Sequence, residues 1–234
     1  RKQVAFIEEQ KQSLIQAQKS KDMFFANMSH EIRTPMNAVV GMCELILREP
    51  NLSDTVRENA MGIRNSGKNL LAIINDILDF SKIESGKLYY AQEPYNLSSV
   101  INDVVAMAMV RKGKKPIEVL VDCDSNMPAV LIGDEMRIRQ IITNLMGNAV
   151  KFTKEGRIKL TLRSEKSGTG VLLRVVVSDT GIGIREEDLK LLFEAFMRLD
   201  AKKNSSVEGT GLGLAITKRL VEGMHGELTI TSKY

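Results

Sequence analysis

The fold of this chain is set by the segment at residues 24–35, which reads FFANMSHEIRTP. It lies inside a longer run in which apolar residues recur every three or four positions, namely Val4, Ile7, Leu14, Phe25, Met28, Ile32, Val39, Met42 and Ile46. This spacing predicts one long coiled-coil-like helix, provided that the polar residues Lys11, Gln18 and Lys21 fill three core positions. Pro35 cannot donate a backbone hydrogen bond to Glu31, so we expect a bend just past residue 30.

A second helix is predicted after Pro50 ends the first pattern, with Ser53 or Asp54 as its N-terminal cap. Its apolar positions are Val56, Ala60, Ile63, Gly67, Leu70, Ile74 and Ile77. Two long helices joined by a short loop form an antiparallel hairpin. Apolar residues beside the main seam, namely Phe24, Leu45, Ile73 and Phe80, could not all be covered within one hairpin. Pairing of two chains into a dimeric four-helix bundle would cover them.

The periodicity changes after Gly86, and residues 89–96, with Pro94, read as a link into a second domain. Apolar patterns then predict helices at residues 97–110, 135–150, 186–192 and 212–223, and strands at residues 117–123, 157–164, 171–177 and 227–231. This mixture predicts an α/β sandwich in which helices cover one face of a mixed sheet. The expected fold class is therefore multidomain, α followed by α/β.

Composition excludes several classes of protein. The chain has 234 residues, is 43% hydrophobic and 26% charged, and carries a net charge of +4, which is typical of a soluble globular protein. Its longest apolar stretch, residues 104–110, is far shorter than the roughly 18 to 20 residues of a membrane span. Cys43 and Cys123 lack metal-site spacing and suggest a reducing compartment. The basic run at residues 111–115 has no interleaved aromatic residues, so we interpret it as a solvated loop and expect no nucleic-acid binding.

His30 is the first candidate for chemistry. It lies two residues from Met28 and from Ile32, so at about 100° per residue it faces away from the seam and towards solvent. A lone helical histidine is usually a surface or capping residue. However, the segment at residues 24–35 resembles the phosphoacceptor box of sensor histidine kinases almost residue for residue. The resemblance implies that His30 accepts a phosphoryl group and that the neighbouring Glu31 acts as its base, whereas by itself Glu31 could be an ordinary exposed glutamate.

An amide stripe marks the predicted helix at residues 135–150. Gln140, Asn144 and Asn148 are spaced i, i+4 and i+8, so they share one face while apolar residues cover another. Amide oxygens suit Mg²⁺ and add no charge beside a triphosphate, and Lys151 is placed to reach a phosphate. The alternative is that these amides only satisfy backbone groups, which fits Gln140 better than the asparagines.

Two glycine-rich segments complete the set. In DTGIGI, residues 179–184, Asp179 ends an apolar strand and could accept a hydrogen bond from an adenine amino group, while Gly181 and Gly183 let the backbone approach a flat ligand. In GTGLGL, residues 209–214, the residues Gly209, Thr210, Gly211, Leu212 and Gly213 precede a helix whose free N–H groups could bind phosphate. Because the spacing is GxGxG, a dinucleotide-binding Rossmann fold is disfavoured. Each segment alone could be a turn or a structural start of a helix.

Together, these segments resemble the N, G1, F (residues 193–196) and G2 boxes of the kinase ATP-binding domain, in this order. The resemblance implies the Bergerat ATP fold, ATP and Mg²⁺ as cofactors with Asn148 as metal ligand, packing of Phe152 near the adenine, and a lid at residues 196–209. It also implies a signalling helix at residues 1–22, a dimerisation and phosphotransfer hairpin at 23–88 and a catalytic domain at 89–234 that lacks its last strand.

The implied function is a homodimeric protein-histidine kinase that passes phosphate to a response-regulator receiver domain. The sequence around His30 is most similar to that of hybrid-type kinases. Upstream sensor and transmission segments are expected, with this chain as the cytoplasmic portion of a membrane-anchored sensor. Thr34 is expected to act in a phosphatase reaction, although a threonine before Pro35 needs no catalytic reason. The rival interpretations are a Bergerat-fold ATPase that uses nucleotide for clamping, and a non-catalytic dimeric signalling module.

Overall fold

The computed structural model describes residues 2–168, 170–197 and 210–234. The chain divides into two compact units, Arg1–Leu88 and Tyr89–Tyr234, and each has its own core. Among the described residues, no helix is both long enough and apolar enough to span a membrane.

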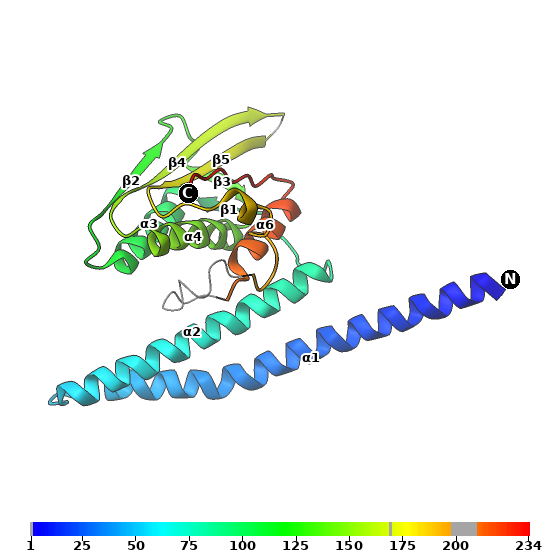
Figure 1. Cartoon of the computed structure of the whole chain (residues 1–234), viewed down its shortest axis with the longest axis horizontal. Coiled ribbons are helices and arrows are strands. Elements are labelled where there is room, and N and C mark those ends of the chain that lie inside the picture. The colour runs from blue at the N-terminus through cyan, green and yellow to red at the C-terminus, as the bar shows by residue number, and fades with distance from the viewer. Residues whose placement is uncertain (1, 169, 198–209) are drawn as a thin grey trace. The chain divides into compact units, whose positions relative to one another are not determined.

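The first unit is the predicted helical hairpin (Figure 1). Helix α1, Lys2–Ile46, continues through Pro35, and helix α2, Asp54–Glu84, begins where the Ser53 hydroxyl accepts a hydrogen bond from the Val56 amide at 3.4 Å. Three side-chain contacts set the antiparallel register: Lys21–Glu84 at 2.7 Å, Arg33–Asn75 at 3.0 Å and Lys68–Glu44 at 2.9 Å.

The buried interface between α1 and α2 differs from the predicted seam. In the described part of α1 the buried apolar residues are Val40 and Cys43, each one position along from the predicted Val39 and Met42, which are exposed. In α2, Gly67 is buried against Val40. The approach is so close that a Cβ added to Gly67 would lie only 2.7 Å from a methyl carbon of Val40. The predicted seam of α1 therefore lies beside the contact with α2, not inside it, and leaves an apolar face uncovered.

The second unit is a layer of helices against a mixed sheet. Strands β2 (Ile117–Cys123) and β4 (Gly156–Ser167) are parallel, and β4 pairs antiparallel with β5 (Gly170–Asp179), which gives the order β2-β4-β5. Helices α3 (Leu97–Lys112), α4 (Glu135–Phe152) and α6 (Gly213–Gly223) lie on one side of this sheet in Figure 1. The core lies between these layers, where alternate β4 residues Ile158, Leu160 and Leu162 join Ile142 and Met146 of α4.

Four elements differ from the prediction. Residues 93–96, predicted as a link, form the strand β1 (Glu93–Asn96). It pairs antiparallel with β3 (Val130–Gly133), and β3 was not predicted because it is only four residues long. Helix α5 (Glu186–Leu189) ends three residues before the predicted position. Residues 227–231 were wrongly predicted as a strand, since the end of the chain instead packs on the loop after β5, with the Ser232 hydroxyl accepting from the Ile184 amide at 2.9 Å.

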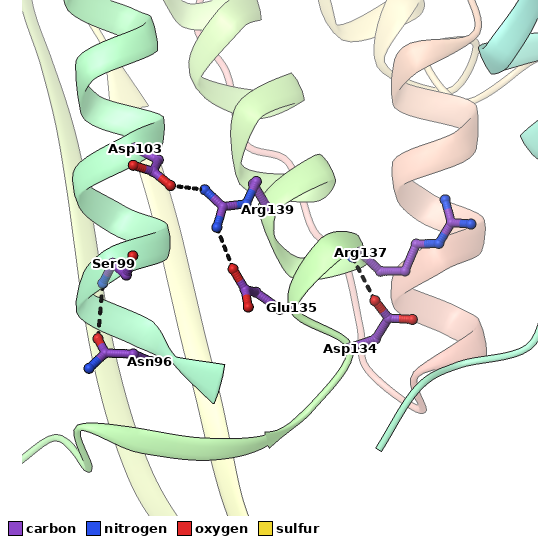
Figure 2. Close-up of polar contacts among 7 residues, drawn as sticks. All are labelled: Asn96, Ser99, Asp103, Asp134, Glu135, Arg137 and Arg139. Carbon is purple, nitrogen blue, oxygen red and sulfur yellow. Dashed lines mark hydrogen bonds and ion pairs between the residues drawn. The ribbon is translucent and has the colours of Figure 1, made fainter. Parts of the chain in front are cut away.

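Helix α4 is fixed at its first turn by polar contacts (Figure 2). Asp134 caps it by accepting from the Arg137 amide at 3.0 Å, and its other oxygen accepts from the Ala91 amide at 3.0 Å. Arg139 bridges Glu135 of α4 and Asp103 of α3. These contacts fix the orientation of the helix that carries the amide stripe.

Candidate functional site

The three amides of α4 have different environments. The Gln140 carbonyl oxygen accepts from the Arg137 guanidinium at 2.7 Å, and the Asn144 amide nitrogen donates to the Thr217 hydroxyl of α6 at 2.7 Å. The side chain of Asn148 is half-buried, and within the described part of the chain its amide has no hydrogen-bond partner. Asn148 is therefore the member of the stripe that has no partner among the described residues, whereas Asn144 is held by α6.

The second glycine segment packs directly on this stripe. A Cβ added to Gly213 would lie 2.5 Å from the Asn144 side-chain oxygen, so the glycine allows α6 to approach α4. Gly211 has a φ of +72°, and its carbonyl accepts from the Phe196 amide at 3.2 Å. Leu212 is buried, and Thr210 accepts from the Leu212 amide at 3.1 Å.

Helix α6 begins without a side-chain cap, which leaves its first N–H groups for another acceptor. The F-box residue Phe196 is exposed and has a φ of +65°, a strained conformation for a non-glycine residue. Gly209 and the expected lid residues Lys202, Lys203, Asn204, Ser205 and Ser206 lie outside the described residues.

The first glycine segment meets the other end of α4. Asp179 ends β5, and one of its carboxylate oxygens accepts from the Gly181 amide at 2.8 Å. The Ile182 amide donates to the Phe152 carbonyl at 3.4 Å, and a Cβ added to Gly181 would lie 2.7 Å from this same carbonyl oxygen. Gly183 has a φ of +70° and lies against the Lys233 backbone. The loop thus reaches α4 only because Gly181 lacks a side chain.

Lys151 and Phe152 form the last turn of α4 between these contacts. Both side chains are half-buried, and the Lys151 ammonium lies 4.9 Å from the centre of the Phe152 ring. Helix α4 therefore brings Asn148, Lys151 and Phe152 together with the glycine segments at residues 179–183 and 210–213. The described residues contain no cluster of three or more His, Cys, Asp or Glu side chains that could hold a metal ion.

His30 lies in the other unit, on α1, and its side chain is exposed as the helical phase predicts. Ser29 beside it is buried, which places the two side chains on different faces of the helix. Glu31 and Thr34 are exposed, and the Thr34 hydroxyl donates to the His30 carbonyl at 3.1 Å. An accessible imidazole with an adjacent carboxylate is suited to act as a nucleophile.

Two residues near the site were missed from the sequence. Thr217 is buried and accepts a hydrogen bond from the Asn144 amide. The sequence signal that could have found it is its spacing of four residues from Gly213, which places both residues on the same face of α6. Lys115 was assigned to a solvated loop, but its ammonium contacts the C-terminal end of α4. The basic run is thus partly internal, because its charges satisfy backbone carbonyls.

Comparison with known families assigns both units. A family model described as the His Kinase A (phospho-acceptor) domain matches residues 20–86, and one described as the histidine kinase-, DNA gyrase B-, and HSP90-like ATPase matches residues 133–234. The chain belongs to the histidine kinases. The predicted family is thereby confirmed, and its ATPase-type unit is the one built around α4.

Individual relatives of this chain are longer proteins. It is 44% identical over 219 residues to the signal transduction histidine-protein kinase BarA of Escherichia coli (strain K12), covering 93% of this chain and 24% of BarA. It is 42% identical over 209 residues to the hybrid signal transduction histidine kinase L of Dictyostelium discoideum, covering 88% of this chain and 12% of that protein. The chain therefore spans a quarter or less of these relatives.

A solved structure supports the fold of this chain as well. The crystal structure of full-length ShkA in complex with AMPPNP aligns with a TM-score of 0.69 at 35% identity, covering 86% of this chain and 41% of that one. The predicted order, a helical hairpin followed by an α/β unit with a mixed sheet, is confirmed.

Proposed function

We propose that this chain is the ATP-dependent core of a hybrid-type sensor kinase, which phosphorylates His30 and passes the phosphoryl group to a receiver-domain aspartate. The observation that carries the proposal is the exposed His30 on α1, within a phosphoacceptor-type segment, in the same chain as an ATPase-type unit. The domains would be a signalling helix at residues 1–22, the phosphotransfer hairpin at 23–88 and the catalytic domain at 89–234. Sensor and transmission segments would lie upstream and would make this chain the cytoplasmic portion of a membrane-anchored sensor, and the relatives' greater length leaves room for such segments.

The chemical step is a phosphoryl transfer. A ring nitrogen of His30 forms a bond to the γ-phosphorus while the bond from that phosphorus to the bridging oxygen breaks and ADP leaves. Glu31 accepts the proton from the other ring nitrogen and so keeps the attacking nitrogen nucleophilic. Catalysis comes mainly from positioning and from neutralising phosphate charge.

The nucleotide would lie along α4. Asp179 accepts from the adenine amino group, Phe152 packs beside the ring, and Gly181 and Gly183 keep the loop backbone close. The phosphates would contact Lys151 and the free N–H groups at the start of α6, which has no side-chain cap. The residues of this segment are Gly209, Thr210, Gly211, Leu212 and Gly213. Asn144 packs against Gly213 and holds α6 in place.

Mg²⁺ fits the donor set at one residue. The half-buried amide of Asn148 has no hydrogen-bond partner within the described ranges, and a neutral oxygen ligand suits a hard cation that also binds phosphates. When bound, the ion neutralises charge on the triphosphate. Asn148 would hold it.

A homodimer is the expected assembly. Large apolar side chains on the hairpin are exposed in the single chain, among them Met42 at 63%, Ile63 at 52% and Val39 at 39%. An open apolar groove over Val39, Ile63 and Leu70 lies on this surface. A second hairpin would cover these residues and complete a four-helix bundle.

The test uses the fact that the chain has only two histidines, His30 and His225. With γ-labelled ATP and Mg²⁺, the wild type should acquire acid-labile, base-stable label. His30→Gln should lose the label and keep its nucleotide affinity. His225→Asn should label normally, and asparagine is chosen because it tolerates the positive φ of 60° at this position. Label retained in His30→Gln would contradict the assignment, and nucleotide hydrolysis without protein label would favour a clamp-type ATPase.

Phosphatase activity is proposed for the same helix face. Thr34 lies one helical turn after His30, and because its hydroxyl donates to the His30 carbonyl, its oxygen can still accept from a water. That water would attack the acyl phosphate of the regulator. Thr34→Ala should leave His30 labelling intact and slow the loss of phosphate from the regulator, and Thr34→Ser should restore it. Equal decay with wild type and Thr34→Ala would refute the role.

A further inference from the structure

The C-terminal end of α4 is held by a lysine from outside the helix. The Lys115 ammonium donates to the backbone carbonyls of Val150 at 2.6 Å, Lys151 at 3.4 Å and Thr153 at 3.1 Å. An ammonium group has three N–H donors and no acceptor, so these contacts use all of them. The last carbonyls of a helix lack intrahelical partners and form the negative end of its dipole, which favours a cation at this position.

The other carbonyls of this turn also have partners. The Ala149 carbonyl accepts from the Thr153 amide at 3.0 Å, and the Phe152 carbonyl accepts from the Ile182 amide at 3.4 Å. Lys115 and the loop after Asp179 therefore hold interleaved carbonyls of one turn. If that turn frays, the acceptor for the loop moves with it.

The segment that carries Lys115 is itself fixed. The Lys115 amide donates to the Lys112 carbonyl at 3.0 Å, and the Lys115 carbonyl accepts from the Ile117 amide at 2.8 Å. The Pro116 carbonyl accepts from the Gly156 amide of β4 at 3.1 Å. Because its backbone is tied to α3 and β4, Lys115 reaches α4 from a rigid base.

We infer that Lys115 is a positioning residue for the nucleotide site: by clamping the last turn of α4 it holds Lys151, Phe152 and the Asp179–Gly183 loop in one preformed surface. The inference rests on the proposed nucleotide site. Lys115 does not touch the nucleotide in this scheme. It acts by keeping the site ordered before the nucleotide binds, which lowers the entropic cost of binding.

The experiment compares Lys115→Met, which keeps the side-chain length and loses the charge, with Lys114→Met at the neighbouring exposed lysine. Nucleotide Kd should rise at least about tenfold in Lys115→Met, close to the lower end of the effect expected for losing a hydrogen bond to a charged group. Lys114→Met should bind like wild type, and Lys115→Arg, which retains charge and donors, should restore most of the affinity. Amide exchange at Thr153 and Ile182, followed by NMR in the full chain without nucleotide, should become faster in Lys115→Met alone.

The two readouts separate this inference from the proposed function. If the wild type binds no nucleotide, the proposed function fails. The exchange rates at Thr153 and Ile182 would still show whether Lys115 holds the last turn of α4. Unchanged exchange at Thr153 and Ile182, or faster exchange with wild-type Kd, overturns the positioning role. Should Lys115→Met not fold, Lys115→Gln, which is shorter and uncharged, replaces it, and faster exchange at Thr153 and Ile182 with wild-type affinity in that variant would equally overturn the positioning role.

Discussion

At the scale of single residues, the amide stripe of α4 shows how neighbours separate side chains that look equivalent in sequence. Gln140 is occupied by Arg137 of its own helix, and Asn144 is occupied by Thr217, which lies 73 residues further along the chain. Asn148 alone among the three has no protein partner in the described ranges. Helical spacing could predict the shared face, but the docking of α6 decided that Asn144 is occupied while Asn148 has no partner among the described residues.

This difference leads to a prediction for Asn148. Asn148→Asp should lower His30 labelling by at least about tenfold, because it adds a negative charge beside the nucleotide phosphates, and a tenfold change needs only about 1.4 kcal/mol. Labelling rates at several Mg²⁺ concentrations measure the effect. Gln140→Glu is the matched control, since it makes the same charge change beside Arg137 and should label at nearly the wild-type rate. A similar loss in both variants would point to net charge and not to the site.

At the scale of elements, two glycines inside helices have opposite roles. Gly147 of α4 lies against the guanidinium of Arg111, a flexible group that can move, whereas Gly67 of α2 lies against the methyl group of buried Val40. A glycine in a helix costs about 1 kcal/mol relative to alanine. At Gly67 this cost is offset by the close approach of α1.

Gly67→Ala should therefore destabilise the hairpin by roughly 1 to 3 kcal/mol despite its better helix propensity, because the added methyl overpacks the interface with Val40. Thermal unfolding of the full chain, monitored by circular dichroism, measures the change. Gly41→Ala is the control, since nothing lies within 4 Å of its added Cβ, and it should be neutral or slightly stabilising. If both variants gained stability, the close approach at Gly67 would be unimportant.

At the scale of the whole molecule, the chain consists of two units with separate cores. The hairpin buries Val40, Cys43, Ala60 and Ile74, while the core of the second unit begins at Tyr95. The exposed apolar face of the hairpin predicts that its stability depends on association, whereas the second unit already buries a continuous core.

The units should therefore separate cleanly. Residues 89–234 alone should unfold cooperatively, bind nucleotide with nearly the affinity of the full chain and acquire no label. Residues 1–88 should have a Tm that rises with protein concentration, because dimerisation stabilises the hairpin. Mixing the two pieces with γ-labelled ATP should restore labelling of His30. Calorimetry at two concentrations and a labelling assay test this, and a concentration-independent Tm for residues 1–88 would argue against the dimer.

The sequence by itself determined the hairpin, the strand at residues 117–123, the α4 stripe and the exposure of His30, because each depends on local periodicity or capping. Tertiary structure alone decided the pairing of β1 with β3, the choice of Val40 over Val39 inside the hairpin, the packing of residues 232–234 on the loop after β5, and the contact of Lys115 with the end of α4. These features depend on contacts between residues distant in sequence, such as Lys115 with Val150 or Asn144 with Thr217. Spacing along one element carries no information about them.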